Sequence, residues 1–246
     1  MKKYLLALFI AIISINVSAQ TLSVIPKIGI TVSTISMEET DNVPFPGFED
    51  EIKSKIGFTI GAALNYSIND RISIQPELNF IQKGYTEKST STWTEDDDGR
   101  FITTVTTSTT KNTLNYLEIP TLVKISFGGD TKFYVLAGPS FGIGLGGKYT
   151  NDSKITESYD DVSDTFKNSD KGNIKFGDRP ENAEGIYIDN RLDFGLQLGG
   201  GILIARKILI EARYGLGLSN LYDSENNPET KNRVFQLTAG IPLTLR

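Results

Sequence analysis

The chain has 246 residues, no cysteine, no histidine and a formal net charge of −5. Without cysteine no disulfide can brace it, and without histidine it can form neither a Ser-His-Asp triad nor a histidine-bearing zinc site. Its mildly acidic charge argues against a nucleic-acid partner, which would require a basic face.

Residues 1–19 have the pattern of a secretory signal peptide. Lys2 and Lys3 precede a ten-residue apolar run from Tyr4 to Ile13, and small residues follow at 17–19. A transmembrane helix needs about 20 apolar residues, so this run is too short to be one. Because no cysteine follows it, a cysteine-linked lipid anchor is also excluded. We expect a mature exported domain of residues 20–246 with a net charge of −7.

Eight segments of the mature sequence alternate apolar residues with small or polar ones, which is the period of a β-strand. Most of them reach the length of about 9–11 residues that a tilted strand needs to cross a bilayer. Pro76 falls on the apolar side of the third segment and predicts a bulge or kink there. The expected strands are 24–34, 56–68, 72–80, 114–127, 132–146, 192–204, 208–218 and 234–246.

Long connections alternate strictly with short ones along the chain. Tight turns are expected at 69–70, 128–130 and 205–207, and the long connections are 36–55, 85–112, 147–187 and 222–231. Threonine favours strands, so we expect 85–112 to extend its flanking strands as a ribbon that turns near 96–99. We expect 147–187 to be a polar loop. Strict alternation is typical of an up-and-down barrel whose long loops all lie at one end.

The bulky apolar residues form one continuous face on each strand, and the opposite face mixes small residues with charges. In a soluble lipocalin-like barrel, which is the alternative, the bulky face would point inward and the ladders would be shorter. We therefore predict an all-β, eight-stranded antiparallel up-and-down transmembrane β-barrel in the outer membrane of a Gram-negative bacterium. Outer-membrane lipid would surround it.

Several charged residues lie on the face predicted to point into the lumen. An eight-stranded interior is just wide enough for side chains to fill it, so charges there must pair to offset their desolvation. We expect a structural ionic network rather than a conducting pore, and no catalytic, cofactor or metal site. A carboxylate pair acting as acid and base is the alternative. The predicted lumen residues are Lys27, Glu77, Glu118, Lys124, Asp193, Glu211 and Arg213.

Three other features allow a functional interpretation and a simpler one. The acidic cluster Glu95 to Asp98 offers oxygen ligands for calcium but lacks a full ligand pattern, which favours a solvated hairpin tip. Trp93 and Tyr85 could touch a partner, but aromatic residues at strand ends commonly anchor a barrel at the membrane interface. The glycines from Gly142 to Gly147 lie within a strand, which favours small lumen residues over a phosphate loop.

The strand and turn motifs resemble the outer-membrane β-barrel domain family common in Bacteroidetes, a group that includes PorT-like proteins. The similar stretches cover nearly the whole mature chain: PKIGITVS from Pro26, GFTIGAALNYSINDRISIQPELNFIQKGY from Gly57, LNYLEIPTLVKI from Leu114, FYVLAGPSFGIGL from Phe133 and RYGLGLSNL from Arg213. Arg246 departs from the aromatic residue that ends many such barrels. PorT-like membership would imply a part in type IX secretion or gliding.

These patterns predict a non-enzymatic protein without a cofactor. Its role would be structural or interactive, with the long external loops meeting a ligand, a neighbouring protein or the surface polysaccharide. Three alternatives remain open: a component of a secretion or gliding machine, transport of a small or lipidic solute, and soluble ligand carriage.

Overall fold

The computed structural model describes residues 22–37, 47–98, 100–159, 162–182, 184–223 and 228–245. The predicted signal peptide and Arg246 lie outside these ranges. Among the described residues there is no helix long and apolar enough to span a membrane. The strands are β1 (Leu22–Met37), β2 (Phe48–Ser67), β3 (Ile72–Asp97), β4 (Arg100–Gly128), β5 (Lys132–Tyr159), β6 (Val162–Phe176), β7 (Ile186–Ile188), β8 (Leu192–Ile204), β9 (Ile208–Gly217), β10 (Thr230–Gly240) and β11 (Leu243–Leu245).

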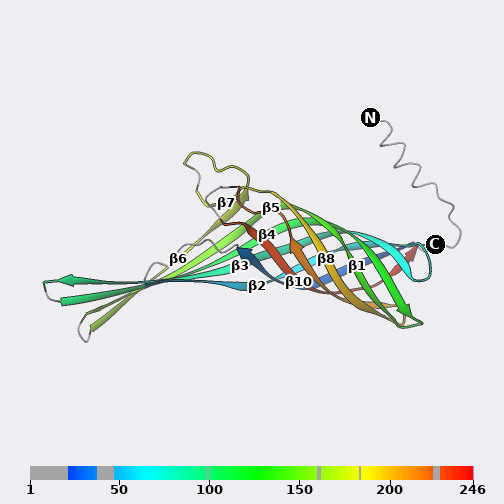
Figure 1. Cartoon of the computed structure of the whole chain (residues 1–246), viewed down its shortest axis with the longest axis horizontal. Helices are drawn as coiled ribbons and strands as arrows, with labels where there is room; N and C mark the ends of the chain where they lie inside the picture. The colour runs from blue at the N-terminus through cyan, green and yellow to red at the C-terminus, as the bar shows by residue number, and fades with distance from the viewer. Residues whose placement is uncertain are drawn as a thin grey trace.

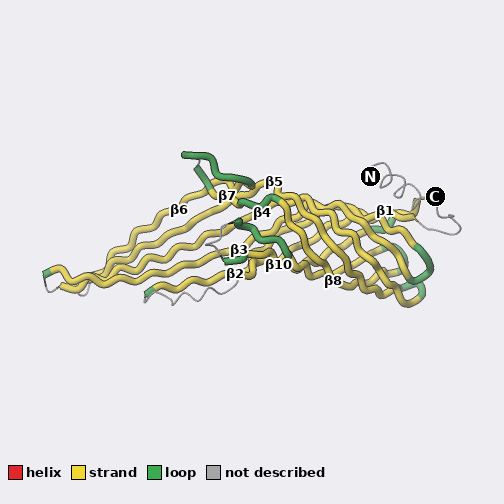
Figure 2. The backbone as a smooth tube through the Cα atoms, turned by 45° about the horizontal axis from the view of Figure 1, so that its top comes forward, coloured by secondary structure: helices red, strands yellow, loops and turns green. Residues whose placement is uncertain are grey.

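Eight of these strands form a closed ring (Figures 1 and 2). The order β4-β3-β2-β1-β10-β9-β8-β5 is closed by pairing between β4 and β5, and every neighbouring pair in the ring is antiparallel. β11 pairs with β1 just beyond the end of β10. The prediction of an eight-stranded antiparallel up-and-down barrel is confirmed.

The three short turns lie together at one end of the barrel, which we call the short-turn end. The turn between β8 and β9 shows why it is tight: Ala205 and Arg206 both have positive φ values, 47° and 58°, and Ile204 pairs directly with Ile208. Positive φ at both central residues matches the right-handed twist of the flanking strands. The predicted turn at 205–207 is therefore present, and the long connections lie at the opposite end.

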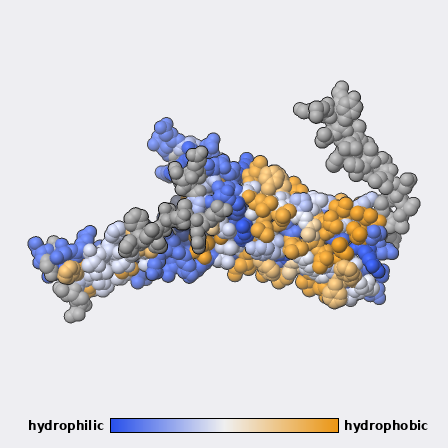
Figure 3. All heavy atoms as spheres, in the orientation of Figure 1, coloured by the Kyte–Doolittle hydropathy of each residue, from blue (hydrophilic) through white to orange (hydrophobic). Residues whose placement is uncertain are grey.

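The outside of the ring carries a broad apolar belt (Figure 3). Ile56 is 72% exposed, Leu198 66% and Phe133 60%, while the residues between them on each strand point inward. Large exposed apolar residues all around a barrel are typical of a wall that faces lipid. This orientation is the reverse of a soluble ligand-carrying barrel, so the lipocalin-like alternative does not describe the fold.

Beyond the belt, at the end opposite the short turns, five strands continue as one sheet, seen at the left of Figure 1. We call it the projecting sheet: residues 48–54, 84–97, 100–113, 147–159 and 162–173, paired in that order. The predicted 85–112 ribbon is confirmed, with its turn at Asp98. The predicted loops were wrong in part, because 48–55 belongs to β2, 147–159 forms the end of β5 and 162–176 forms β6. Water on both faces removes the apolar alternation that would have predicted these strands.

Pro76 does not create the predicted bulge. β3 keeps the same register with both neighbours on either side of it, although pairing with β2 is interrupted between Ile74 and Glu77, and pairing with β4 between Pro76 and Asn79. Pro76 lies on the lipid-facing side, where the missing N–H leaves a gap in the ladder without shifting it. The register shifts occur instead between Ser54 and Thr59 and between Asn115 and Tyr116, close to where the barrel becomes the projecting sheet.

Substituting Leu196→Arg should destabilise the barrel. Leu196 is 51% exposed within the apolar belt, and an arginine near the bilayer midplane costs about 2–4 kcal/mol. The free energy of unfolding, measured by denaturant titration in lipid vesicles, should fall by that amount. Thr156→Arg, on the projecting sheet outside the belt, is the matched control and should stay near the parent value. Equal stability of the two variants would contradict the lipid-facing assignment.

Candidate functional site: a filled and capped lumen

The inward side chains fill the barrel with a buried ionic network between two apolar layers. All seven charged residues predicted for the lumen point inward and are buried, with exposed fractions of 0–6%. They come from five of the eight ring strands, because the strand period of two brings every second residue of each strand to the inside. The network has two clusters, which share a link through Arg213.

The cluster nearer the short-turn end, which we call the lower cluster, is built around Glu77. Lys27 Nζ lies 2.6 Å from Glu77 Oε1, and the Arg213 guanidinium donates to both oxygens of the same carboxylate, at 2.9 Å for Oε2. Gln75 Nε2 and Asn79 Nδ2 also donate to it, at 2.6 and 2.9 Å. Every oxygen of this carboxylate is therefore used within the protein, which is how a buried charge is tolerated.

Glu211 completes the lower cluster. It pairs with Arg213 and with Lys27, whose Nζ is 3.2 Å from Glu211 Oε1, and it accepts a hydrogen bond of 3.0 Å from the Tyr134 hydroxyl. Lys124 differs from the other lumen cations because none of the carboxylates that the structure describes lies at ion-pair distance from it. Its Nζ donates to Gln75 Oε1 at 3.2 Å and lies 3.9 Å from the centroid of the Tyr134 ring, a cation–π contact.

The cluster nearer the projecting sheet, which we call the upper cluster, is built around Lys83. Its Nζ lies 2.8 Å from Glu118 Oε1 and 2.9 Å from Asp193 Oδ2. Gln197 Nε2 donates to Glu118 at 2.8 Å, and Arg213 Nη1 donates to Gln197 Oε1 at 3.3 Å. Gln197 thereby joins the two clusters into one network.

Sequence reasoning missed Lys83, which balances the network. With it, the lumen holds four cations and four carboxylates. The predicted third strand ends at Phe80, three residues short of Lys83, whereas β3 continues to Asp97. The strict two-residue period from Glu77 through Ile81 is the signal that would have found Lys83.

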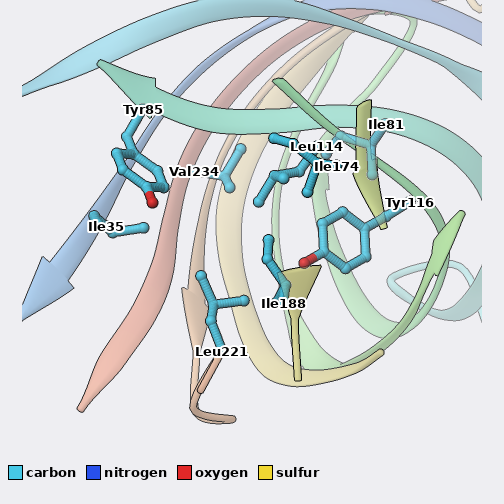
Figure 4. Packing of buried hydrophobic residues seen from close by; sticks show 9 residues of the cluster. All are labelled: Ile35, Ile81, Tyr85, Leu114, Tyr116, Ile174, Ile188, Leu221 and Val234. Atoms are coloured by element: carbon cyan, nitrogen blue, oxygen red, sulfur yellow. The ribbon is translucent and has the colours of Figure 1, made fainter. Parts of the chain in front are cut away.

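An apolar cap covers the network at the end that carries the projecting sheet (Figure 4). It consists of Ile35, Ile81, Tyr85, Leu114, Tyr116, Ile174, Ile188, Leu221 and Val234, all at most 7% exposed. Two connections fold inward to build it: Gly177 N donates to Ile188 O at 2.9 Å, and Leu221 N donates to Thr230 O at 2.8 Å. The cap touches the network directly, because Lys83 Nζ lies 5.0 Å from the Tyr116 ring centroid.

A second apolar layer lies towards the short-turn end: Ile25, Ala63, Leu122, Tyr134, Leu136 and Leu209. Inward glycines make room for bulky neighbours, since a methyl group on Gly201 would lie 2.4 Å from the Tyr134 hydroxyl. A cavity of about 10 Å³ lies in the upper cluster, lined in part by Asp193 and Asn232. That is the space of about one water molecule. Larger cavities of about 90 and 590 Å³ open at the short-turn end, and the first reaches Lys124 and Tyr134. Beyond them the ion pairs and the apolar cap fill the described lumen, so it leaves no continuous path for a solute.

The other sequence features have simple structural roles. Glu95 and Asp96 are adjacent in a strand and point to opposite faces, and the described residues contain no cluster of potential metal ligands. The glycines at 142–147 lie within β5, where Gly144 accommodates the Phe176 ring. The interface-anchor interpretation was wrong, because Tyr85 is buried in the cap and Trp93 lies far out on the projecting sheet, 5.3 Å from the Phe48 ring.

Comparison with known proteins identifies the family. The family described as "Outer membrane protein beta-barrel domain" matches residues 18–223. Among solved structures, Ail, the attachment invasion locus protein of Yersinia pestis, crystallised with the heparin analogue sucrose octasulfate, is 16% identical, covers 91% of this chain and 99% of its own, and gives a TM-score of 0.39. OprG from Pseudomonas aeruginosa is 11% identical, covers 91% of this chain and 96% of its own, and gives a TM-score of 0.30. No curated protein matches the sequence. The chain belongs to the outer membrane protein β-barrel domain family and resides in the outer membrane of a Gram-negative bacterium.

Proposed function

We propose that this protein is a non-enzymatic outer-membrane barrel that anchors an extracellular binding surface. The observation that carries the proposal is the contrast between a filled lumen and a projecting sheet that leaves both faces open to solvent. In outer-membrane barrels the long connections are extracellular, so the projecting sheet stands outside the cell. Partners at this surface would be a protein or a polysaccharide.

The lumen argues against solute transport. A permeating solute would have to cross the apolar cap, the paired charges and the second apolar layer. Removing one member of a buried ion pair is costly, so the network resists opening. A lateral route for a lipidic solute would need the lumen behind the wall to be open, and the Lys27–Glu77 pair occupies it there.

The ionic network is proposed to be structural rather than catalytic. The chain has no histidine to act as a general base. Glu77 and Glu211 share Lys27 and Arg213 as partners and lie beneath the cap. Acid–base catalysis requires that substrate reach one of them, and the packing excludes it.

A narrower proposal is membership of the PorT-like group of Bacteroidetes, with a part in type IX secretion or gliding. The strand motifs that resemble the group support it. A component of a machine needs a surface that other subunits can bind. The aromatic pair Phe48 and Trp93, near the outer end of the sheet, offers such a surface, and Trp93 is 55% exposed.

Substituting Glu77→Ala should destabilise the barrel by about 3–5 kcal/mol, because it leaves the buried cations Lys27 and Arg213 with only one carboxylate, Glu211, between them. Glu51→Ala is the matched control. Glu51 pairs with Lys53 at 3.0 Å on the exposed sheet, and exposed pairs contribute at most about 1 kcal/mol. Denaturant unfolding in lipid vesicles measures both. Equal losses in the two variants would contradict a structural role for the network.

Shortening the projecting sheet should abolish partner binding without unfolding the barrel. Glu87 pairs with Thr110 and Asn151 with Asp170, so an Asn-Gly turn can replace residues 88–109 and another can replace residues 152–169. Chemical crosslinking of intact cells should yield adducts with the parent protein and none with the shortened one. Both proteins should still show heat-dependent migration in the outer-membrane fraction. Adducts that survive the shortening would contradict the proposal.

A further inference from the structure

The projecting sheet has a basic face, which continues the lipid-facing wall of the barrel. Asn112 and Tyr149 point inward, so their neighbours Lys111 and Lys148 point outward. The same alternation, carried through the register of the five strands, brings eight lysines to this face: Lys53, Lys88, Lys111, Lys148, Lys154, Lys167, Lys171 and Lys175.

One row of this face alternates lysine and threonine across all five strands. Lys53 pairs with Thr86, Thr86 with Lys111, Lys111 with Thr150 and Thr150 with Lys171. Neighbouring strands are about 4.8 Å apart, so successive lysines in the row stand about 10 Å apart with a hydroxyl between them. Ammonium and hydroxyl groups are both donors to phosphate oxygens.

Carboxylates on the same face do not balance this charge. Glu49, Glu51, Asp96 and Asp152 are the acidic residues on this face, so its eight lysines outnumber them. Two of them already form ion pairs: Lys53 pairs with Glu51 at 3.0 Å and Lys111 with Asp152 at 3.8 Å. Lys154 lies directly opposite Lys167, an unfavourable like-charge arrangement across strands. Within the described part of the chain, Lys148, Lys154, Lys167 and Lys171 make no ion pair.

The opposite face of the sheet is acidic. The same rows place Asp50, Glu87, Glu157, Asp164 and Asp170 there and no lysine. Burial and the neighbouring Asp50 both raise the pKa of Glu87, as expected where carboxylates gather. The sheet is therefore polarised, and an anionic partner would be attracted to one face and repelled by the other.

We propose that the basic face binds the phosphate-bearing head groups of lipopolysaccharide in the outer leaflet around the barrel. This rests on the proposed function, because it names the ligand class of the extracellular surface. On the outward face, Ile56 and Leu145 are the last exposed apolar residues of β2 and β5, and Lys53 and Lys148 each follow three residues farther out. Three residues of a strand tilted by about 40° rise roughly 7–8 Å, which is the level of the lipid head groups.

A second copy of the chain fits this face poorly. Its complementary surface would be the acidic face, which continues the lumen side and overlooks its own barrel mouth. Two copies in one membrane could bring these faces together only if their barrels overlapped. Lipid needs no such overlap, because it already surrounds the wall from which the basic face rises.

The test compares Lys111→Gln/Lys148→Gln/Lys171→Gln with a control of equal charge change at the short-turn end, Arg71→Gln/Arg206→Gln/Lys207→Gln. Each protein, purified in zwitterionic detergent micelles, is titrated calorimetrically with purified lipopolysaccharide at about 0.15 M salt. The first variant should bind at least tenfold more weakly than the parent, and the control should stay within twofold. Enzymatically dephosphorylated lipopolysaccharide should abolish the difference.

Three outcomes would overturn the proposal: unchanged binding by the first variant, equal binding of dephosphorylated lipopolysaccharide, or preference for dextran sulfate, which would assign the face to a soluble polyanion. Lys154→Gln, which relieves a like-charge contact and so should fold well, provides a second variant and should weaken binding at least threefold.

The outcome of the crosslinking experiment with the shortened sheet does not depend on the outcome of the lipopolysaccharide titration. If adducts depend on the sheet while lipopolysaccharide binding does not depend on these lysines, only the lipid assignment is rejected.

Discussion

Every backbone N–H and C=O group that crosses the hydrocarbon must find a partner within the protein, and a sheet meets this requirement only by closing on itself. Pairing of β4 with β5 completes the ring. Closure at eight strands leaves an interior that side chains alone can fill, and the strand period delivers half of all strand residues to it. Charges brought inside must therefore pair. The four cations and four carboxylates of the lumen, held between two apolar layers, follow from this constraint.

Because the described lumen is filled, the proposed binding surface is the projecting sheet at the end opposite the short turns. Apolar residues from two connections, Ile188 and Leu221, complete the cap, so these connections close the barrel instead of opening it. The two faces of the projecting sheet differ in charge. A basic face rises from the lipid-facing wall and an acidic face overlooks the mouth, so the two faces would attract different partners.

How far the sequence predicts this structure depends on what surrounds each strand. Within the belt, lipid lies on one side and packed side chains on the other, so alternation reveals each strand and the direction of charges such as Glu77 and Arg213. In the projecting sheet, water lies on both sides. The strand from Val162 to Phe176 therefore lacks the alternation of apolar and polar residues that would have predicted it. The cap was unpredictable for another reason: Leu221 and Ile188 are isolated apolar residues in polar connections, and only the tertiary fold brings them together.

The most direct test of a closed barrel is conductance across a planar lipid bilayer. Protein that shows heat-dependent migration, and is therefore folded, is inserted and recorded over a range of voltages and salt concentrations. The filled and capped lumen predicts no stable unitary steps above the baseline. Stable steps that scale with salt concentration would show a continuous aqueous path and would contradict a lumen sealed by paired charges.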